Sequence, residues 1–162
     1  MSGDAHFYDN RRRRLWLSRE WGDRLNSVLL IGLNPSFADE EKPDHTITVE
    51  IEFATRWGFG ALLKGNLFTL ISKDPAQLAI VQDAEGDPQN LRWLEETAAR
   101  ARTIVLCWGD DGQVRSRASY VRGALWDQRK KMFCLGRTKK GEPRHTSRLA
   151  YDTPLQPIWL GQ

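Results

Sequence analysis

Three polar residues of this chain stand where apolar stretches give way to loops. Asn34 follows the apolar run Val28–Ile31 and Gly32, Asn66 lies inside the run 61–68, and His145 lies in a basic loop after the run 131–135. An amide does not titrate, so it binds and orients, whereas a histidine can also exchange a proton near neutral pH. These residue types suit a site that holds a polar ligand. The alternatives are an ordinary strand-to-loop turn at Asn34, an Asn66 that satisfies nearby backbone, and a His145 that hydrogen-bonds only its own loop.

The elements that would position these residues alternate between strands and helices. Apolar runs predict four core strands at 28–33, 61–67, 103–108 and 131–135, and Gly32, Gly109 and Gly136 end three of them. This order predicts an α/β fold with three layers: a central four-stranded parallel sheet, helices on both faces, and a short edge strand around 14–17. We expect one domain over residues 1–162. In such folds ligands lie beyond the carboxyl ends of the strands, which places Asn34, Ser36, Asn66 and His145 at one edge.

Capping residues and apolar spacing predict the helices. Asp44 is expected to cap a helix over about 46–57, and Asp87-Pro88 to begin a second with Leu91, Leu94 and Ala98 on one face. A third is expected from Arg115 to Trp126. The segment 151–162 contains Pro154, Pro157 and Trp159 and is expected to pack as an extended tail.

Positive charge is concentrated in one part of the chain. Residues 100–148 hold 13 Lys/Arg against 4 Asp/Glu, and the remainder holds 11 against 17, so the two parts carry +9 and −6. This asymmetry is typical of a face that binds a polyanion, although solvated helix faces would also produce it. The Arg11–Arg14 run could likewise contact phosphates or remain solvated. The candidate phosphate ligands are Arg115, Arg117, Lys139, Lys140, Arg144 and Arg148.

Other functional classes lack their signals. No apolar run of about 18 residues predicts a membrane span, and the polar N-terminus does not resemble a signal peptide. Cys107 and Cys134 lie in apolar runs, which is typical of buried thiols in a cytoplasmic protein rather than of a disulfide or a metal site. We also expect a monomer without a metal or cofactor. Asp39, Glu41 and Asp44 could hold Mg²⁺, but Asp44 is better explained as a helix cap. Neither a Walker loop nor a dinucleotide fingerprint is present.

Four short motifs carry a resemblance to known families. They are Leu33 to Asp39, Asn66 to Phe68, Trp108-Gly109, and Pro143 to His145. With them, nearly the whole chain resembles a bacterial and phage family described only as a domain of unknown function. Gly32 to Ser36 is also similar to the first motif of the uracil-DNA glycosylase superfamily, closest to its mismatch-specific branch.

The glycosylase resemblance implies roles for individual residues. Asn34 would position the attacking water, Asn66 would recognise a flipped base, and His145 would stabilise the departing anionic base. Here Ser36 replaces a glycine of the branch, and Thr146-Ser147-Arg148 follow the histidine where the glycosylases have Pro-Ser-Pro. The residues expected to contact the base or ligand are Gly32, Pro35, Ser36, Phe37, Asn66, Phe68, Trp108 and Gly109.

The expected function is therefore hydrolysis of the N-glycosidic bond of a damaged, mismatched or modified nucleobase, with nucleic acid, DNA above all, or a nucleotide as partner. Such a reaction on DNA requires that the base leave the stack. Two alternatives remain open from the sequence. One is a nucleic-acid or nucleotide-binding module without catalysis, and the other is an enzyme of free modified nucleotides.

Overall fold

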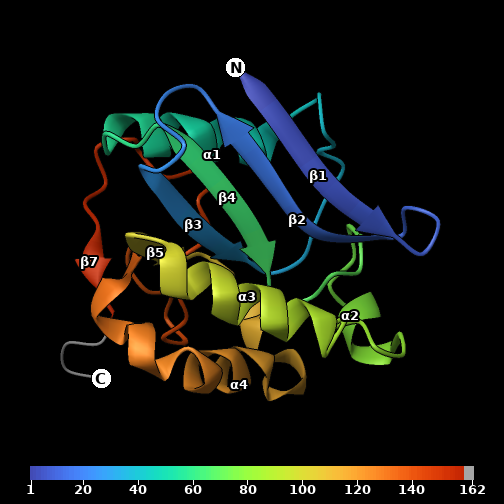
Figure 1. Cartoon of the computed structure of the whole chain (residues 1–162). Helices are drawn as coiled ribbons and strands as arrows, with labels where there is room; N and C mark the ends of the chain where they lie inside the picture. The colour runs from blue at the N-terminus through green and yellow to red at the C-terminus, as the bar shows by residue number, and fades with distance from the viewer. Residues whose placement is uncertain (159–162) are drawn as a thin grey trace.

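The computed structural model describes residues 1–158 and forms a seven-stranded mixed sheet with helices on both faces (Figure 1). The strand order is β1-β2-β4-β3-β5-β6-β7. The strands are β1 (Ser2–Tyr8), β2 (Arg13–Glu20), β3 (Ser27–Gly32), β4 (Ala61–Asn66), β5 (Thr103–Leu106), β6 (Met132–Cys134) and β7 (Gln156–Pro157). The helices are α1 (His45–Arg56), α2 (Gln77–Ile80), α3 (Gln89–Arg100) and α4 (Arg117–Ala124), with 3₁₀ segments at Asp110–Ser116 and Trp126–Lys131.

The sheet is wider than the sequence predicts. β3 pairs in parallel with β4 and β5, and β5 pairs in parallel with β6. The β1–β2, β2–β4 and β6–β7 pairs are antiparallel. The strand expected around 14–17 is confirmed as part of β2, but its expected place at the edge is wrong, because β2 lies inside the sheet and the polar segment 2–8 forms the outer strand. Its polarity is explained by exposure, since an edge strand needs few apolar side chains.

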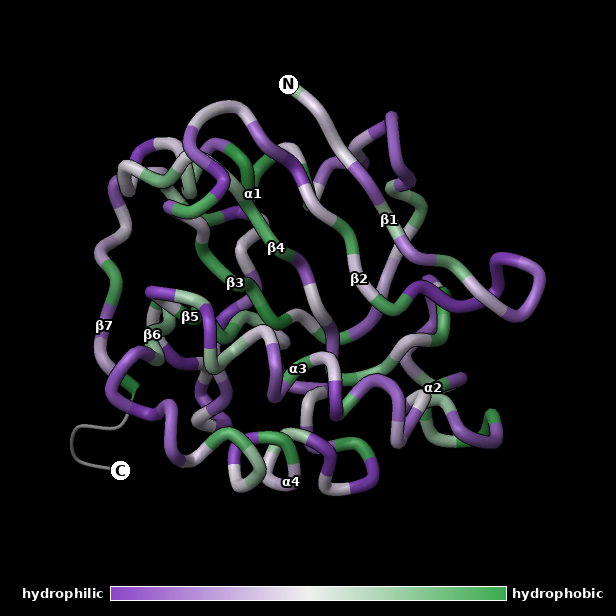
Figure 2. Tube along the Cα trace, in the orientation of Figure 1, coloured by the Kyte–Doolittle hydropathy of each residue, from purple (hydrophilic) through white to green (hydrophobic). Residues whose placement is uncertain are grey.

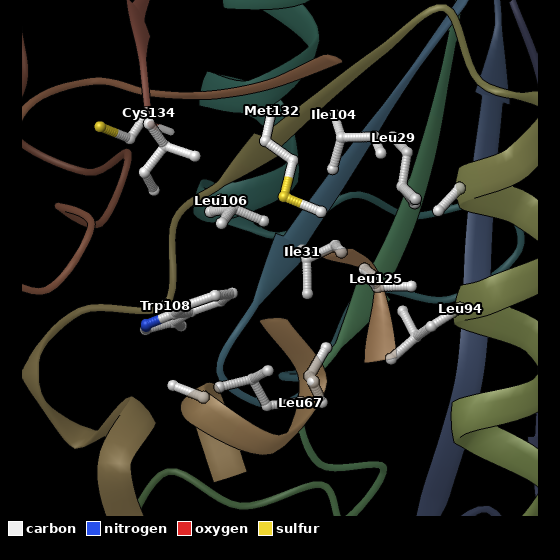
Figure 3. Packing of buried hydrophobic residues seen from close by; sticks show 14 of the residues in the cluster. Leu29, Ile31, Leu67, Leu94, Ile104, Leu106, Trp108, Leu125, Met132 and Cys134 are labelled. Carbon is white, nitrogen blue, oxygen red and sulfur yellow. The ribbon is translucent and has the colours of Figure 1, made fainter. Parts of the chain in front are cut away.

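Two apolar cores lie on opposite faces of the sheet. On one face Leu29 and Ile31 of β3 contact a cluster that includes Leu94 of α3 and Val121 of α4 (Figure 3). On the other face Val28 and Leu30 pack with Ala54 of α1. Successive residues of a strand point to opposite faces, so β3 is apolar throughout because both faces are covered. Strand β3 is accordingly hydrophobic along most of its length, β4 begins hydrophobic and becomes hydrophilic toward its end, and β1 is largely polar (Figure 2).

Helix α1 begins where the sequence predicts. Asp44 Oδ1 accepts a hydrogen bond from the Ile47 backbone N–H at 2.9 Å, which satisfies one of the free donors at the helix start. Helix α3 follows Asp87-Pro88, but Pro88 rather than Asp87 is its N-cap residue, and Asp87 Oδ1 accepts a hydrogen bond from the Leu91 N–H at 3.1 Å.

The helix predicted over Arg115 to Trp126 is shorter than expected. Arg115 and Ser116 have φ values of 54° and 55°, in the left-handed region, so the helix cannot begin before Arg117. Two carbonyl oxygens, Ala79 O and Val81 O, each accept a hydrogen bond from Arg115 Nη2 at 2.9 Å and hold this turn against the preceding loop. The tail contributes β7, and its residues 159–162 lie outside the described part of the chain.

Candidate functional site

A cleft of about 330 Å³ opens beyond the carboxyl ends of β3, β4 and β5. Parallel pairing brings these strand ends, which are far apart in sequence, to one edge of the sheet. Asn34, Asn66 and His145 all line the cleft, as the strand order predicts. The other lining residues are Arg14, Gly32, Leu33, Pro35, Ser36, Thr46, Ile47, Lys64, Ser72, Trp108, Gly109, Asp110 and Asp111.

The half-buried Asn34 side chain has a fixed orientation. Its Nδ2 donates to Leu70 O at 3.0 Å and to Ser72 O at 2.9 Å. Only the nitrogen of the amide can face two carbonyl oxygens, so the assignment of Nδ2 and Oδ1 is settled by its partners. No residue in 1–158 donates a hydrogen bond to Asn34 Oδ1. The amide therefore holds the 70–72 loop with its donors and keeps its acceptor for a ligand or water.

Asn66 is a buried polar residue whose side chain lacks hydrogen-bond partners in the described chain. Its side chain is 1% exposed, and within the described chain neither Nδ2 nor Oδ1 has a hydrogen-bond partner. A Cβ placed on Gly32 would lie 3.0 Å from Asn66 Oδ1 and 2.7 Å from Lys64 Nζ. A side chain at position 32 would therefore press on both polar groups, and the flexible end of Lys64 would have to shift to accommodate it.

The His145 loop is held against the end of β5. Gly109 N–H donates to Pro143 O at 2.8 Å, and the buried Trp108 donates its Nε1–H to Glu142 Oε2 at 2.7 Å. Arg144 N–H donates to Gly136 O at 3.0 Å. These bonds fix the segment 142–144 that directly precedes the histidine, so the approach of the loop to the cleft is set by specific hydrogen bonds.

The hydrogen bonds of His145 also define its tautomer. Ser147 N–H donates to His145 Nδ1 at 3.1 Å, and Ser147 Oγ lies 2.7 Å from the same nitrogen. In the neutral ring Nδ1 is then the acceptor and Nε2 carries the hydrogen. Partial burial lowers the pKa of His145, and the nearby Lys64 charge lowers it further against the opposing effects of Glu50 and Asp44. At neutral pH the ring is a neutral N–H donor.

A buried ion pair that the sequence reasoning missed supports the floor of the cleft. Lys64 Nζ lies 2.7 Å from Glu50 Oε1, and the two side chains are 5% and 0% exposed. Thr146 Oγ1 donates to the same carboxylate oxygen at 3.2 Å. Glu50 therefore connects α1, β4 and the residue after His145. Burial alone would lower the pKa of Lys64, but the Glu50 carboxylate that pairs with it helps to raise the pKa above its ordinary value, so the ammonium stays charged.

The sequence did contain a signal for this pair. Lys64 interrupts an otherwise apolar strand, and Glu50 falls on the inner face of its helix, three residues after Ile47 and four before Ala54. A charged residue at a core position of an amphipathic pattern needs a partner. Two residues of opposite charge at core positions of neighbouring elements therefore predict that the two side chains pair with each other.

Arg14 is a second buried cation at the cleft. It is 1% exposed and donates from Nη1 to Ala38 O at 2.9 Å, while its Nε has no partner in the described chain. None of the carboxylates in residues 1–158 forms an ion pair with it. Burial lowers the pKa of Arg14 to about 10, and the charges of Asp44 and Glu50 partly offset this effect.

Two of the predicted ligand contacts, Phe68 and Phe37, are not among the residues that line the cleft. Phe68 is fully buried in the core, so its ring cannot stack on a base without unfolding that core. Phe37 is 64% exposed beside the cleft, with Lys73 Nζ 4.9 Å from its ring centre. Trp108 and Gly109 line the cleft, as do Pro35 and Ser36.

The predicted phosphate ligands divide into two groups. Arg117 is 3% exposed and pairs with Asp87, and Arg115 pairs with Glu85, so both have protein partners. The remaining four are exposed: Lys139, Lys140, Arg144 and Arg148. Contact of any of the six with phosphate stays a prediction.

Within residues 1–158 there is neither a cluster of metal ligands nor a helix that could cross a membrane. No group of three or more His, Cys, Asp or Glu side chains in residues 1–158 could hold a metal ion. Asp39 Oδ1 instead accepts two backbone N–H bonds, from Glu41 and Lys42, and Asp44 caps α1. None of the helices in this range is long and apolar enough to cross a membrane. Both cysteines are buried and free, and burial raises the pKa of Cys107 to about 12.

The fold and cleft define an α/β protein with a polar pocket at the carboxyl edge of a mixed sheet. Comparison with known proteins assigns the chain to a family. Residues 14–146 match the family described as "Protein of unknown function (DUF1643)", and the chain belongs to it. No curated protein and no solved structure matches the chain.

Proposed function

We propose that this protein hydrolyses the N-glycosidic bond of a nucleobase held in the cleft. The observation that carries the proposal is Asn66, a buried amide with neither its donor nor its acceptor satisfied by residues 1–158. Leaving such a group unpaired costs about 1–3 kcal/mol, and a ligand that pairs with both atoms recovers that energy. The edge of a nucleobase offers adjacent donors and acceptors that match an amide.

The residues on either side of Asn66 suit the remaining steps. Asn34 retains a free acceptor oxygen that could orient a water toward the sugar carbon. His145 retains an Nε2–H that could donate to the base as negative charge develops on it. The neutral tautomer fits this role, since it provides a donor without adding a full charge in the ground state. The motif resemblance to the glycosylases, and the parallel pairing of β4, β3, β5 and β6, support the same assignment.

The test uses a panel of duplex oligonucleotides, each with one modified or mismatched base. Alkali-labile abasic sites are the measured product, under single-turnover conditions. We expect at least one base to be released, with His145→Ala lowering the rate on the order of 10²-fold. His6→Ala is the matched control, because His6 lies on β1 and does not line the cleft. If folded protein releases no base from any duplex, the proposal fails for DNA.

Arg144 provides the contrast with its neighbour. As an exposed cation it would contact phosphate, so Arg144→Ala should weaken binding in a salt-dependent manner with little change in the single-turnover rate. A histidine that only orders its loop would instead lower the thermal midpoint without changing the rate per folded molecule. Equal losses of rate, affinity and thermal midpoint in His145→Ala would show that the histidine is structural.

A binding module without catalysis is the second candidate. Both hydrogens of the Asn34 amide are occupied by loop carbonyls, which gives this residue a structural task that needs no chemistry. Asn34→Asp removes both donors to Leu70 O and Ser72 O, so the thermal midpoint should fall under either candidate. Under the binding alternative the remaining effect is a change of affinity. Under the hydrolase proposal a carboxylate oxygen still orients water, so activity per folded molecule is retained.

A further inference from the structure

The unpaired groups at the cleft floor are mostly hydrogen-bond donors. Asn66 Nδ2 and Arg14 Nε have no partner among residues 1–158. Lys64 has three ammonium hydrogens, of which Glu50 Oε1 accepts one at 2.7 Å, and its next contact is the weakly accepting Cys107 Sγ at 3.9 Å. Among the unpaired buried acceptors, Asn66 Oδ1 belongs to a residue that lines the cleft, whereas Glu50 Oε2 and Asp44 Oδ2 belong to residues that do not.

The charged residues that line the cleft are the cations Arg14 and Lys64 and the carboxylates Asp110 and Asp111, and Asp110 already accepts a hydrogen bond from Thr138. Arg14 is a buried guanidinium without an ion pair, and isolated buried charges are strongly unfavourable unless a counter-ion or hydrogen bonds compensate them. Lys64 has its carboxylate partner on the protein side, since Glu50 is fully buried and does not line the cleft. Lys64 also lines the cleft. Its ammonium has room at this position because Gly32 carries no side chain.

We propose that Lys64 and Arg14 form an anion subsite at the cleft floor that binds a negatively charged oxygen of the ligand. This inference rests on the proposed function for its substrate class, but the subsite itself is a binding property that does not require catalysis. Two sources supply such an oxygen: an oxygen-bearing nucleobase in its anionic form, or a phosphate or carboxylate group of the ligand. Asn66, whose side-chain nitrogen and oxygen are also unpaired, would then contact the neutral part of the same group.

Two probes distinguish the sources in binding titrations followed by NMR or calorimetry. Inorganic phosphate tests a simple oxyanion. Free xanthine, which carries two exocyclic oxygens and ionises readily, tests an anionic base, and adenine is its amino-bearing comparator. Binding of phosphate alone assigns the subsite to an acidic group, and binding of xanthine in preference to adenine assigns it to the base. Either result supports the subsite.

Gly32→Ala is the main variant because it keeps every charge. The added Cβ would fall 2.7 Å from Lys64 Nζ, so the ammonium must move away from the cleft while its pairing with Glu50 can persist. We expect this variant to weaken binding of the responding probe at least tenfold. Lys130→Met is the matched control, because Lys130 is exposed and lies outside the cleft.

A second variant guards against the loss of folding. Lys64→Met with Glu50→Gln removes both charges of the ion pair and leaves no uncompensated carboxylate, so binding should be lost from a folded protein. The subsite is refuted if wild-type protein binds neither probe, or if both variants bind as tightly as wild type. Because no turnover is measured, these outcomes are independent of whether base release is found.

Discussion

Two buried polar clusters lie on opposite sides of the end of β4, and they are satisfied to different degrees. The cleft-floor cluster consists of Glu50, Lys64 and Asn66. The loop-anchoring cluster consists of Asp87, Asn90 and Arg117, and Asn90 Nδ2 donates to three carbonyl oxygens.

The contrast is sharpest between the two asparagines. Both are almost fully buried, yet Asn90 Nδ2 pairs with the backbone carbonyl of Asn66 itself at 3.0 Å, while the Asn66 side chain pairs with nothing in residues 1–158. In the loop-anchoring cluster Arg117 Nε also donates to Leu67 O at 2.8 Å. The backbone at this strand end is therefore held by the loop-anchoring cluster, whereas the Asn66 side chain has no hydrogen-bond partner in residues 1–158. The amide oxygens of both asparagines are unpaired in the described chain, so the two residues differ in the amide nitrogen, which is satisfied in Asn90 and unsatisfied in Asn66.

Removing Lys64 should have the largest effect on stability. In Lys64→Met the Glu50 carboxylate remains buried without its cation, which costs about 3–5 kcal/mol of the free energy of unfolding. Urea denaturation of the single variant and of the Lys64→Met/Glu50→Gln pair measures this. The double variant should recover most of the loss. A single variant within about 1 kcal/mol of wild type would mean that water reaches the pair and screens it.

Asn90→Ala should be the next most destabilising change. It leaves the carbonyl oxygens of Asn66, Leu67 and Glu85 without their shared donor, so we expect a loss of about 2–3 kcal/mol. The midpoint of chemical denaturation is the readout. Because the segment before α3 is held by this side chain, hydrogen exchange of the amides at 85–87 should also accelerate.

Asn66→Ala tests the other half of the comparison. Since the amide has no partner in the described chain, its removal relieves an unpaired buried group, and stability should change by less than about 1 kcal/mol. Ligand binding or base release should nevertheless be lost. If Asn66→Ala destabilises the protein as much as Asn90→Ala, the distinction between the two asparagines is wrong.

The smallest expected effect is the pH dependence contributed by His145. Partial burial and the Lys64 charge hold its pKa below the ordinary value of 6.5, so the unfolded chain takes up a proton at higher pH than the folded chain. This contribution to stability is complete above about pH 6.5 and declines as the pH falls toward the folded pKa. The difference in unfolding free energy between wild type and His145→Ala, followed from pH 8 to 5, should show this decline. A difference that does not vary with pH would place the folded pKa at its ordinary value.

Local patterns in the sequence determined much of the fold. The apolar runs of β3 and β5 indicate strands covered on both faces, and Asp44 marks the start of α1, because periodicity and capping depend on residues close in sequence. The alternation of strands and helices also predicted that Asn34, Asn66 and His145 would meet at one edge. The N-terminal strand β1 was missed, since an exposed edge strand has no apolar pattern to reveal it.

Only the tertiary structure decided which charged groups face one another. Thr146 and Glu50, 96 residues apart, share a hydrogen bond, and Lys64 reaches the same carboxylate from a different element. Arg117 reads in the sequence as part of a basic face but is buried against Asp87. Which charged residues pair in this way depends on strand register and helix placement, and neither can be read from local sequence patterns. The sequence therefore located the cleft, and the packing of α1 against the sheet determined the charged residues at its floor.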